Sequence, residues 1–138
     1  MPYPCVKNEL AILNTVKAMT DIEKEIEKLK FHISLIGETI DHTSNPIAAL
    51  VISMNWNAKD LDSAHDIFEK YDRQLESNEE VNWHQFEHEL REKFNIGYQT
   101  VKSIVLAFYR NHQWTEVCKR YAQAYECMEF HEITRPKD

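Results

Sequence analysis

Glycine is scarce in this sequence, which contains only Gly37 and Gly97, far apart from each other. Loops that cradle phosphate groups need several closely spaced glycines, because the backbone must approach the phosphate. β-Sandwiches and barrels need many tight turns, yet two of the four prolines, Pro2 and Pro4, lie at the N-terminus. The composition therefore excludes glycine-rich nucleotide loops and favours long helices.

Paired cysteines and long apolar runs are also lacking. Cys5, Cys118 and Cys127 are odd in number and form no C-x-x-C pair, so a disulfide framework is not expected. No apolar run approaches the roughly 20 residues that cross a bilayer. The N-terminus does not have the charged-then-apolar order of a signal peptide. We therefore expect reduced thiols, no membrane partner and a cytoplasmic location.

The formal net charge of -7 is unevenly distributed. Residues 60–90 carry ten acidic and two basic side chains, whereas residues 91–120 carry two acidic and six basic ones. Adjacent blocks of opposite sign are typical of solvated helix faces. The acidic block is also a candidate protein-binding face, and the basic block is the part of the chain that suits nucleic acid.

Apolar residues recur at helical spacing along most of the 138 residues. The pattern predicts an all-α fold, a compact bundle of about six or seven helices in a single domain spanning residues 1–138. Beyond the N-terminal region, the predicted helices span about 46–54, 58–76, 83–94, 98–111 and 114–130. We expect residues 1–20 to be an N-terminal extension and residues 131–138 to be a frayed tail.

A heptad pattern marks the N-terminal region. Its apolar members are separated alternately by four and three residues: Ile22, Ile26, Leu29, Ile33, Ile36 and Ile40. We call these residues the heptad seam. Such spacing is typical of coiled coils, so the seam predicts either a homo-oligomer or protein partner, or packing against later helices of the same chain. Thr20 and Glu23 match a capping box that would start a new helix, yet residues 6–41 are also compatible with a single helix.

Residues 90–105 resemble a helix-turn-helix motif, with Asn95 in the turn. In that interpretation the recognition helix would contact DNA through five residues: Tyr98, Gln99, Thr100, Lys102 and Ser103. Two features oppose it. Arg91 occupies a position where the motif normally has a small residue, and the second helix is apolar on more than one side, although a DNA-reading helix needs a free face.

Catalytic signatures are weak. His84 to His88 match the H-x-x-E-H pattern of zinc peptidases, but those enzymes need a third protein ligand and a substrate cleft. The acidic segment near residues 74–85 has the order of a calcium loop without its aspartate, glycine and bidentate glutamate. We expect no catalytic residues, no metal site and no cofactor.

Three segments carry a resemblance to a known family: IEKLKFHISLIGETID, NPIAALVISMNW and FEHELREKFNIGYQTVKSIVLAFYRNHQWTEVCKRY. From about Ile22 to Tyr125 the chain resembles the YhaI-like family of small, all-helical bacterial proteins of unknown function. The resemblance implies an α-helical bundle that is cytoplasmic and oligomeric, and it supplies no activity and no site. Small proteins of this kind also occur on mobile elements, which makes a prophage origin an open alternative.

These observations together favour a non-enzymatic protein-protein interaction or regulatory protein that self-associates. The alternative is a DNA-binding transcriptional regulator that uses residues 90–105.

Overall fold

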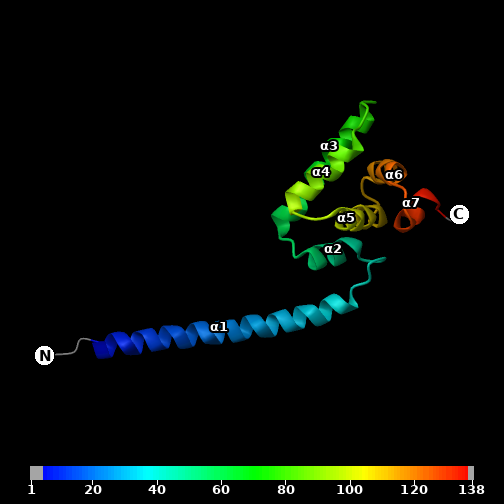
Figure 1. Ribbon diagram of the computed structural model, residues 1–138. Coiled ribbons are helices and arrows are strands. Elements are labelled where there is room, and N and C mark those ends of the chain that lie inside the picture. The colour runs from blue at the N-terminus through cyan, green and yellow to red at the C-terminus, as the bar shows by residue number, and fades with distance from the viewer. Residues whose placement is uncertain (1–4, 137–138) are drawn as a thin grey trace. The chain divides into compact units, whose positions relative to one another are not determined.

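The computed structural model describes residues 5–136, and their side chains from residue 11 onward. The chain divides into two units, Met1–Thr39 and Ile40–Asp138. Every regular element in the described part is helical, which confirms the all-α prediction (Figure 1). The single-domain prediction for residues 1–138 remains a prediction.

The first unit contains one helix, α1 (Cys5–Thr39), 35 residues long. The hydroxyl of Thr20 donates to the carbonyl of Val16 at 2.8 Å, so Thr20 lies inside the helix and does not cap a new one. Its hydrogen bond belongs to the helix interior, where Ser and Thr side chains return to a preceding carbonyl. The prediction that a second helix starts at Thr20 is therefore wrong, and the single-helix alternative is confirmed.

The second unit contains the remaining helices, and asparagines set several of their ends. They are α2 (Pro46–Met54), α3 (Ala58–Glu76), α4 (Trp83–Phe94), α5 (Tyr98–Arg110), α6 (Thr115–Ala124), the 3-10 turn η1 (Met128–Phe130) and α7 (His131–Thr134). Asn57 and Asp60 form a reciprocal capping box at the start of α3. Asn55 and Asn95 end α2 and α4 in the left-handed conformation that Asn tolerates.

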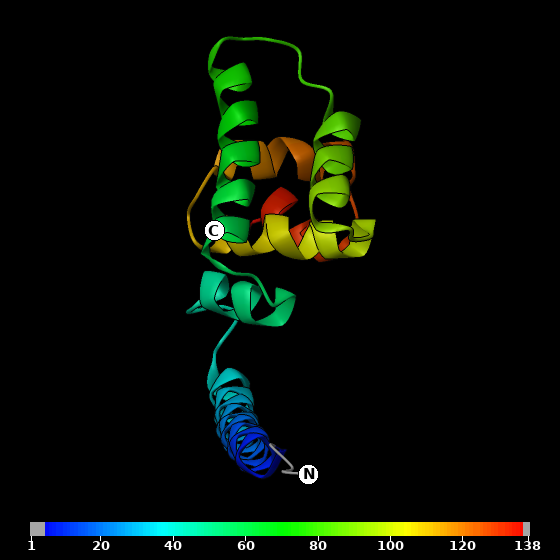
Figure 2. The ribbon, with the colours of Figure 1, turned by 90° about the vertical axis from the view of Figure 1, so that its left-hand side faces the viewer.

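Helices α3 and α4 lie side by side, and α5 and α6 cross them (Figure 2). Helix α5 is central, because α2, α4, α6 and η1 all pack on it. The pairing of α3 with α4 is also polar: Lys70 Nζ lies 2.7 Å from Glu89 Oε1, and the Tyr71 hydroxyl donates to the same oxygen at 3.0 Å. Burial is the main cause that raises the pKa of Tyr71, and the Glu89 carboxylate adds to it.

The last helix was predicted at about 114–130, and this length is wrong, because the helix is shorter in the structure. Helix α6 ends at Ala124, and Met128, which lies within the predicted range, is 80% exposed. The chain instead turns through η1, which places Phe130 and Ile133 in the core. The expected frayed tail is likewise wrong for residues 131–134, because the burial of Ile133 anchors α7.

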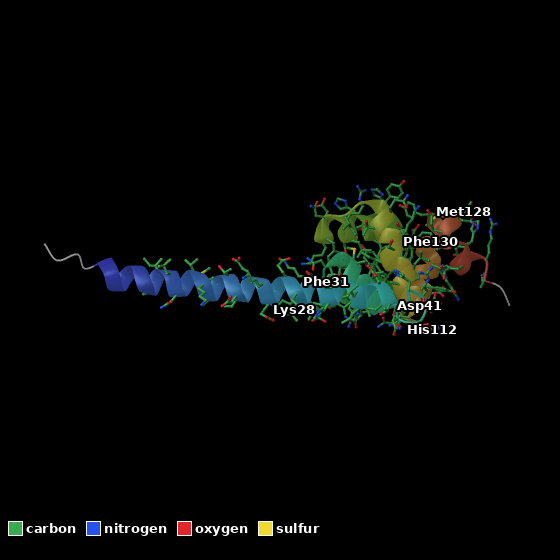
Figure 3. The ribbon with its side chains drawn as sticks, turned by 90° about the horizontal axis from the view of Figure 1, so that it is seen from below. Lys28, Phe31, Asp41, His112, Met128 and Phe130 are labelled. Atoms are coloured by element: carbon green, nitrogen blue, oxygen red, sulfur yellow. The ribbon has the colours of Figure 1, made fainter. Side chains whose placement is uncertain are left out.

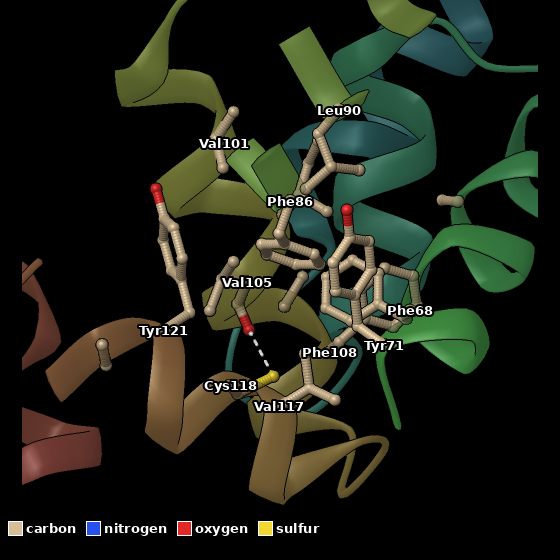
Figure 4. Packing of buried hydrophobic residues seen from close by; sticks show 14 of the residues in the cluster. Phe68, Tyr71, Phe86, Leu90, Val101, Val105, Phe108, Val117, Cys118 and Tyr121 are labelled. Carbon is tan, nitrogen blue, oxygen red and sulfur yellow. Dashed lines mark hydrogen bonds between the residues drawn. The ribbon is translucent and has the colours of Figure 1, made fainter. Parts of the chain in front are cut away.

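The core of the second unit is built from aromatic rings (Figure 4). Phe86 lies within 5.1–5.6 Å, centroid to centroid, of four rings: Phe68, Tyr71, Trp83 and Tyr121. Most of these pairs are edge-to-face, a favourable arrangement for aromatic quadrupoles. The buried Cys118 thiol donates to the Val105 carbonyl at 3.5 Å, which joins α6 to the central α5.

Candidate functional site

The heptad seam lies on α1, apart from its last member. Ile26 and Ile33 occupy a positions, and Ile22, Leu29 and Ile36 occupy d positions. All five side chains are exposed. Ile40 would be the next a position, but α1 ends at Thr39, and Ile40 belongs to the second unit. Within residues 5–39, the described part of the first unit, α1 is the only element, so no other element there can cover this stripe.

The seam extends further toward the N-terminus than the spacing from Ile22 to Ile40 predicted. Counting back by seven from Ile26 places Met19 and Ile12 at a positions, and both are exposed on the same continuous helix. Thr15 occupies the intervening d position, where its hydroxyl donates to the Ala11 carbonyl at 2.9 Å. That bond satisfies the hydroxyl, so Thr15 can enter an apolar layer. The sequence left open whether a new helix starts at Thr20, and only a continuous helix puts Ile12 and Met19 in register with Ile26.

Opposite charges flank the seam. Glu25 occupies a g position and Lys30 an e position. Within α1, Lys28 lies 3.5 Å from Glu25 and Lys30 lies 3.4 Å from Glu27, and all four side chains are largely exposed. Such exposed pairs contribute little, so they can be exchanged for contacts with another helix. Lys28 and Phe31, labelled in Figure 3, occupy c and f positions on the side away from the seam.

The predicted helix-turn-helix segment does form two helices joined by a short turn. Asn95 has φ 51°, and Gly97 caps the start of α5 in an extended conformation. Arg91, expected to conflict with the motif, is exposed. The left-handed backbone at Asn95 is the conformation expected in the turn of the motif.

The five predicted DNA contacts are not presented together. Tyr98, Gln99 and Ser103 are exposed, and Thr100 is half-buried. The side chain of Lys102 is only 13% exposed, its Nζ lies 3.8 Å from Glu129 Oε2, and it packs over the Tyr98 ring. Lys102 is thus largely covered and paired with Glu129, and α2, α4 and α6 pack on α5.

The histidines and the glutamate of the H-x-x-E-H pattern lie in different environments. His84 and His88 are exposed, whereas Glu87 points into the bundle and is 9% exposed. Burial raises the pKa of Tyr121 and Tyr125, and the nearby Glu87 carboxylate raises both further. The residues that the structure describes contain no group of three or more His, Cys, Asp or Glu side chains placed to hold a metal ion.

A pocket lies between α2 and α5, with Leu50, Ser103, Leu106 and Arg110 among its lining residues. Its volume is about 160 Å³, below the roughly 300–1,000 Å³ of ordinary small-molecule sites. Arg110 is occupied by two hydrogen bonds to Glu132, at 3.1 and 2.5 Å. This pocket does not have the size of a substrate site.

Among the helices of residues 5–136, none combines the length and apolar character needed to cross a membrane.

Comparison with known proteins places the chain in a family without supplying an activity. No curated protein and no solved structure matches it. The sequence model of one protein family matches residues 19–125, from within α1 to the end of α6. The N-terminal part of α1 lies outside this match. Because the match covers well over half of the sequence, the chain belongs to the family described as "Protein of unknown function (DUF1878)".

Proposed function

We propose that this protein is a non-enzymatic, self-associating helical protein that acts through protein-protein interaction, with the heptad seam of α1 as its contact surface. The observation that carries the proposal is the seam itself. Apolar side chains at a and d positions run from Ile12 to Ile36 along one continuous helix, and they are exposed. Regular apolar heptads of this length are typical of helices that pair.

The energetics of a lone helix support a partner. Helices in water owe most of their stability to the packing of an apolar face. Full burial of an isoleucine or leucine side chain contributes about 1.5–3 kcal/mol. Seven apolar a and d side chains on α1 are exposed, so covering this face would offset the entropy cost of ordering a helix of this length.

We propose that the seam is covered by the same helix of other copies of the chain. The charges at its edge support self-recognition, because Glu25 at g and Lys30 at e present opposite signs toward an identical neighbour.

The acidic block on α3 supports binding of a different, basic protein. Its exposed carboxylates, including Asp62, Asp66 and Glu69, leave a charged face open to a basic partner protein.

A single substitution tests the seam. Replacing Ile33 with Asn puts a polar amide into an a layer, and we expect the mass in solution to fall to that of the monomer at micromolar concentration. Sedimentation equilibrium measures this mass. Leu35→Asn is the matched control, because Leu35 is also exposed and apolar on α1 but occupies a c position. A monomeric wild-type chain would refute self-association.

A DNA-binding transcriptional regulator is the second candidate function. The geometry of the turn at Asn95 and the exposure of Tyr98, Gln99 and Ser103 support it. The pairing of Lys102 with Glu129 and the packing around α5 oppose it. Duplex DNA binding that weakens with salt and is lost in Gln99→Ala/Lys102→Ala would favour this function. Absence of binding at low salt would remove it.

Some expectations from the sequence remain predictions: the resemblance to the YhaI-like family, the bacterial and cytoplasmic setting, and the prophage origin. Purification of the full chain from its native host with its bound proteins, followed by mass spectrometry, tests the partner.

A further inference from the structure

The d layers of the seam are the first guide to the number of chains that associate. Ile22 and Ile36 are β-branched at d, and so is Thr15; Leu29 is the exception. Two-stranded parallel coils favour β-branched residues at a and leucine at d. Isoleucine at both a and d shifts the preference to three strands, and leucine at a with isoleucine at d shifts it to four. Since Ile26 and Ile33 occupy a, the core composition favours three strands over two or four.

In the N-terminal half of the seam, the flanking e and g positions also favour more than two helices. There the e and g positions are Val16 and Ala18, and Val16 is exposed. A helix with two neighbours instead of one buries part of its e and g positions along with a and d. Apolar residues at these flanks therefore suit an assembly of more than two helices.

Symmetry then sets the direction of the helices. Three identical chains close around a threefold axis, and rotation about that axis keeps every helix pointing the same way. In a parallel, in-register coil, a g side chain lies near the e side chain five residues further on in the neighbouring helix. Glu25 thereby meets Lys30 of the neighbouring copy, and all three such contacts join opposite charges.

Resting on the self-association proposed above, we infer that three copies of this chain associate through α1 as a parallel, in-register coiled coil. Its a layers contain Ile12, Met19, Ile26 and Ile33, and its d layers contain Thr15, Ile22, Leu29 and Ile36. Contacts between Glu25 and Lys30 of adjacent copies set the register. The Ile40–Asp138 units follow α1 at the same end of the coil in all three chains.

The number of chains is tested by mass. Sedimentation equilibrium of the full chain should give three times the chain mass of 16.4 kDa. In Ile22→Leu/Ile36→Leu, leucine occupies the d layers at 22, 29 and 36, which alternate with the isoleucine a layers at 26 and 33, and we expect a shift from three chains to two. The control Leu13→Ile, at an exposed b position, should stay at three. A wild-type dimer or tetramer would overturn the inference and leave self-association standing, whereas a wild-type monomer would refute both.

The direction of the helices is tested by charge exchange. Lys30→Glu places two acidic side chains against each other, and we expect the association constant to fall about tenfold. Glu25→Lys/Lys30→Glu should restore it if the helices are parallel. In an antiparallel arrangement, e positions face e positions, so Glu23→Lys/Lys30→Glu would restore it instead. That result would overturn the inference. Glu27→Lys/Lys28→Glu, at the outer b and c positions, is the control and should leave association unchanged.

Discussion

Phe86→Ala is expected to be among the most destabilising single substitutions in the second unit. The Phe86 side chain is fully buried, and four aromatic rings surround it at 5.1–5.6 Å. Truncation of a buried phenylalanine costs about 3–5 kcal/mol, because transfer energy is lost and a cavity remains. We expect a loss near 4 kcal/mol, since α3, α4 and α6 all contribute rings and cannot collapse together into the space.

The expected loss is a large fraction of the stability of the unit. Domains of this size are stable by about 5–15 kcal/mol. Each 1 kcal/mol shifts the midpoint of thermal unfolding by about 4–8 °C in a domain of 60–100 residues, so Tm should fall by about 15–30 °C. Phe86→Leu keeps most of the apolar volume, and volume-conserving apolar exchanges usually cost less than about 1.5 kcal/mol. The aromatic contacts of Phe86 are lost in addition, so we expect a loss of unfolding free energy above that value but smaller than for Phe86→Ala.

Tryptophan fluorescence is a suitable assay, because Trp56, Trp83 and Trp114 all lie within residues 40–138. Urea unfolding followed by fluorescence therefore reports the free energy of the second unit alone. Phe31→Ala is the matched control, since Phe31 lies on α1 and is 60% exposed. We expect it to change the fluorescence-detected free energy by less than about 0.5 kcal/mol. A loss below about 1.5 kcal/mol for Phe86→Ala would contradict the packing described for this cluster.

Two further predictions concern ionisable groups in the second unit. Burial raises the pKa of the Cys118 thiol, so Cys118 should resist alkylation in the folded chain while the half-buried Cys127 reacts. Mass-spectrometric mapping measures both, and labelling of Cys118 at the rate of Cys127 would contradict its burial. The Asp41 carboxylate accepts from the Thr43 amide at 2.9 Å and the Ser44 hydroxyl at 2.8 Å, and these bonds lower its pKa below the ordinary 3.8. Its contribution to stability is therefore present above pH 3.8 and is lost as pH falls through the lower, folded-state pKa. Denaturant titrations at pH 2–5 should show that wild type loses this contribution and that Asp41→Asn does not; identical pH profiles would refute the assignment.

Local side-chain chemistry was readable from the sequence. Asparagine and proline residues act on their own backbone or on amides within one turn. The predicted bounds of the helices at 46–54, 58–76 and 83–94 agree with α2, α3 and α4 for this reason. The pattern at Thr20 was misleading, because a threonine hydroxyl bonds equally well to a preceding carbonyl inside a helix.

The C-terminal segment shows where local patterns fail. Apolar periodicity continued past Tyr125, yet α6 ends at Ala124 and the chain turns. The gain comes from burying Phe130 and Ile133 against helices distant in sequence, and no local window contains that information. Lys102 is a parallel case, because Glu129 becomes its partner only when η1 packs on α5.

The sequence by itself determined that this protein is helical, that it has a heptad seam on a long N-terminal helix and that its charges are segregated, because these properties depend on spacing within one helix. Tertiary structure alone decided that α5 is a central helix whose Lys102 pairs with Glu129, and that Glu87 points inward between exposed His84 and His88. The physical reason is that burial and ion pairing arise between elements far apart in the chain, where spacing carries no signal.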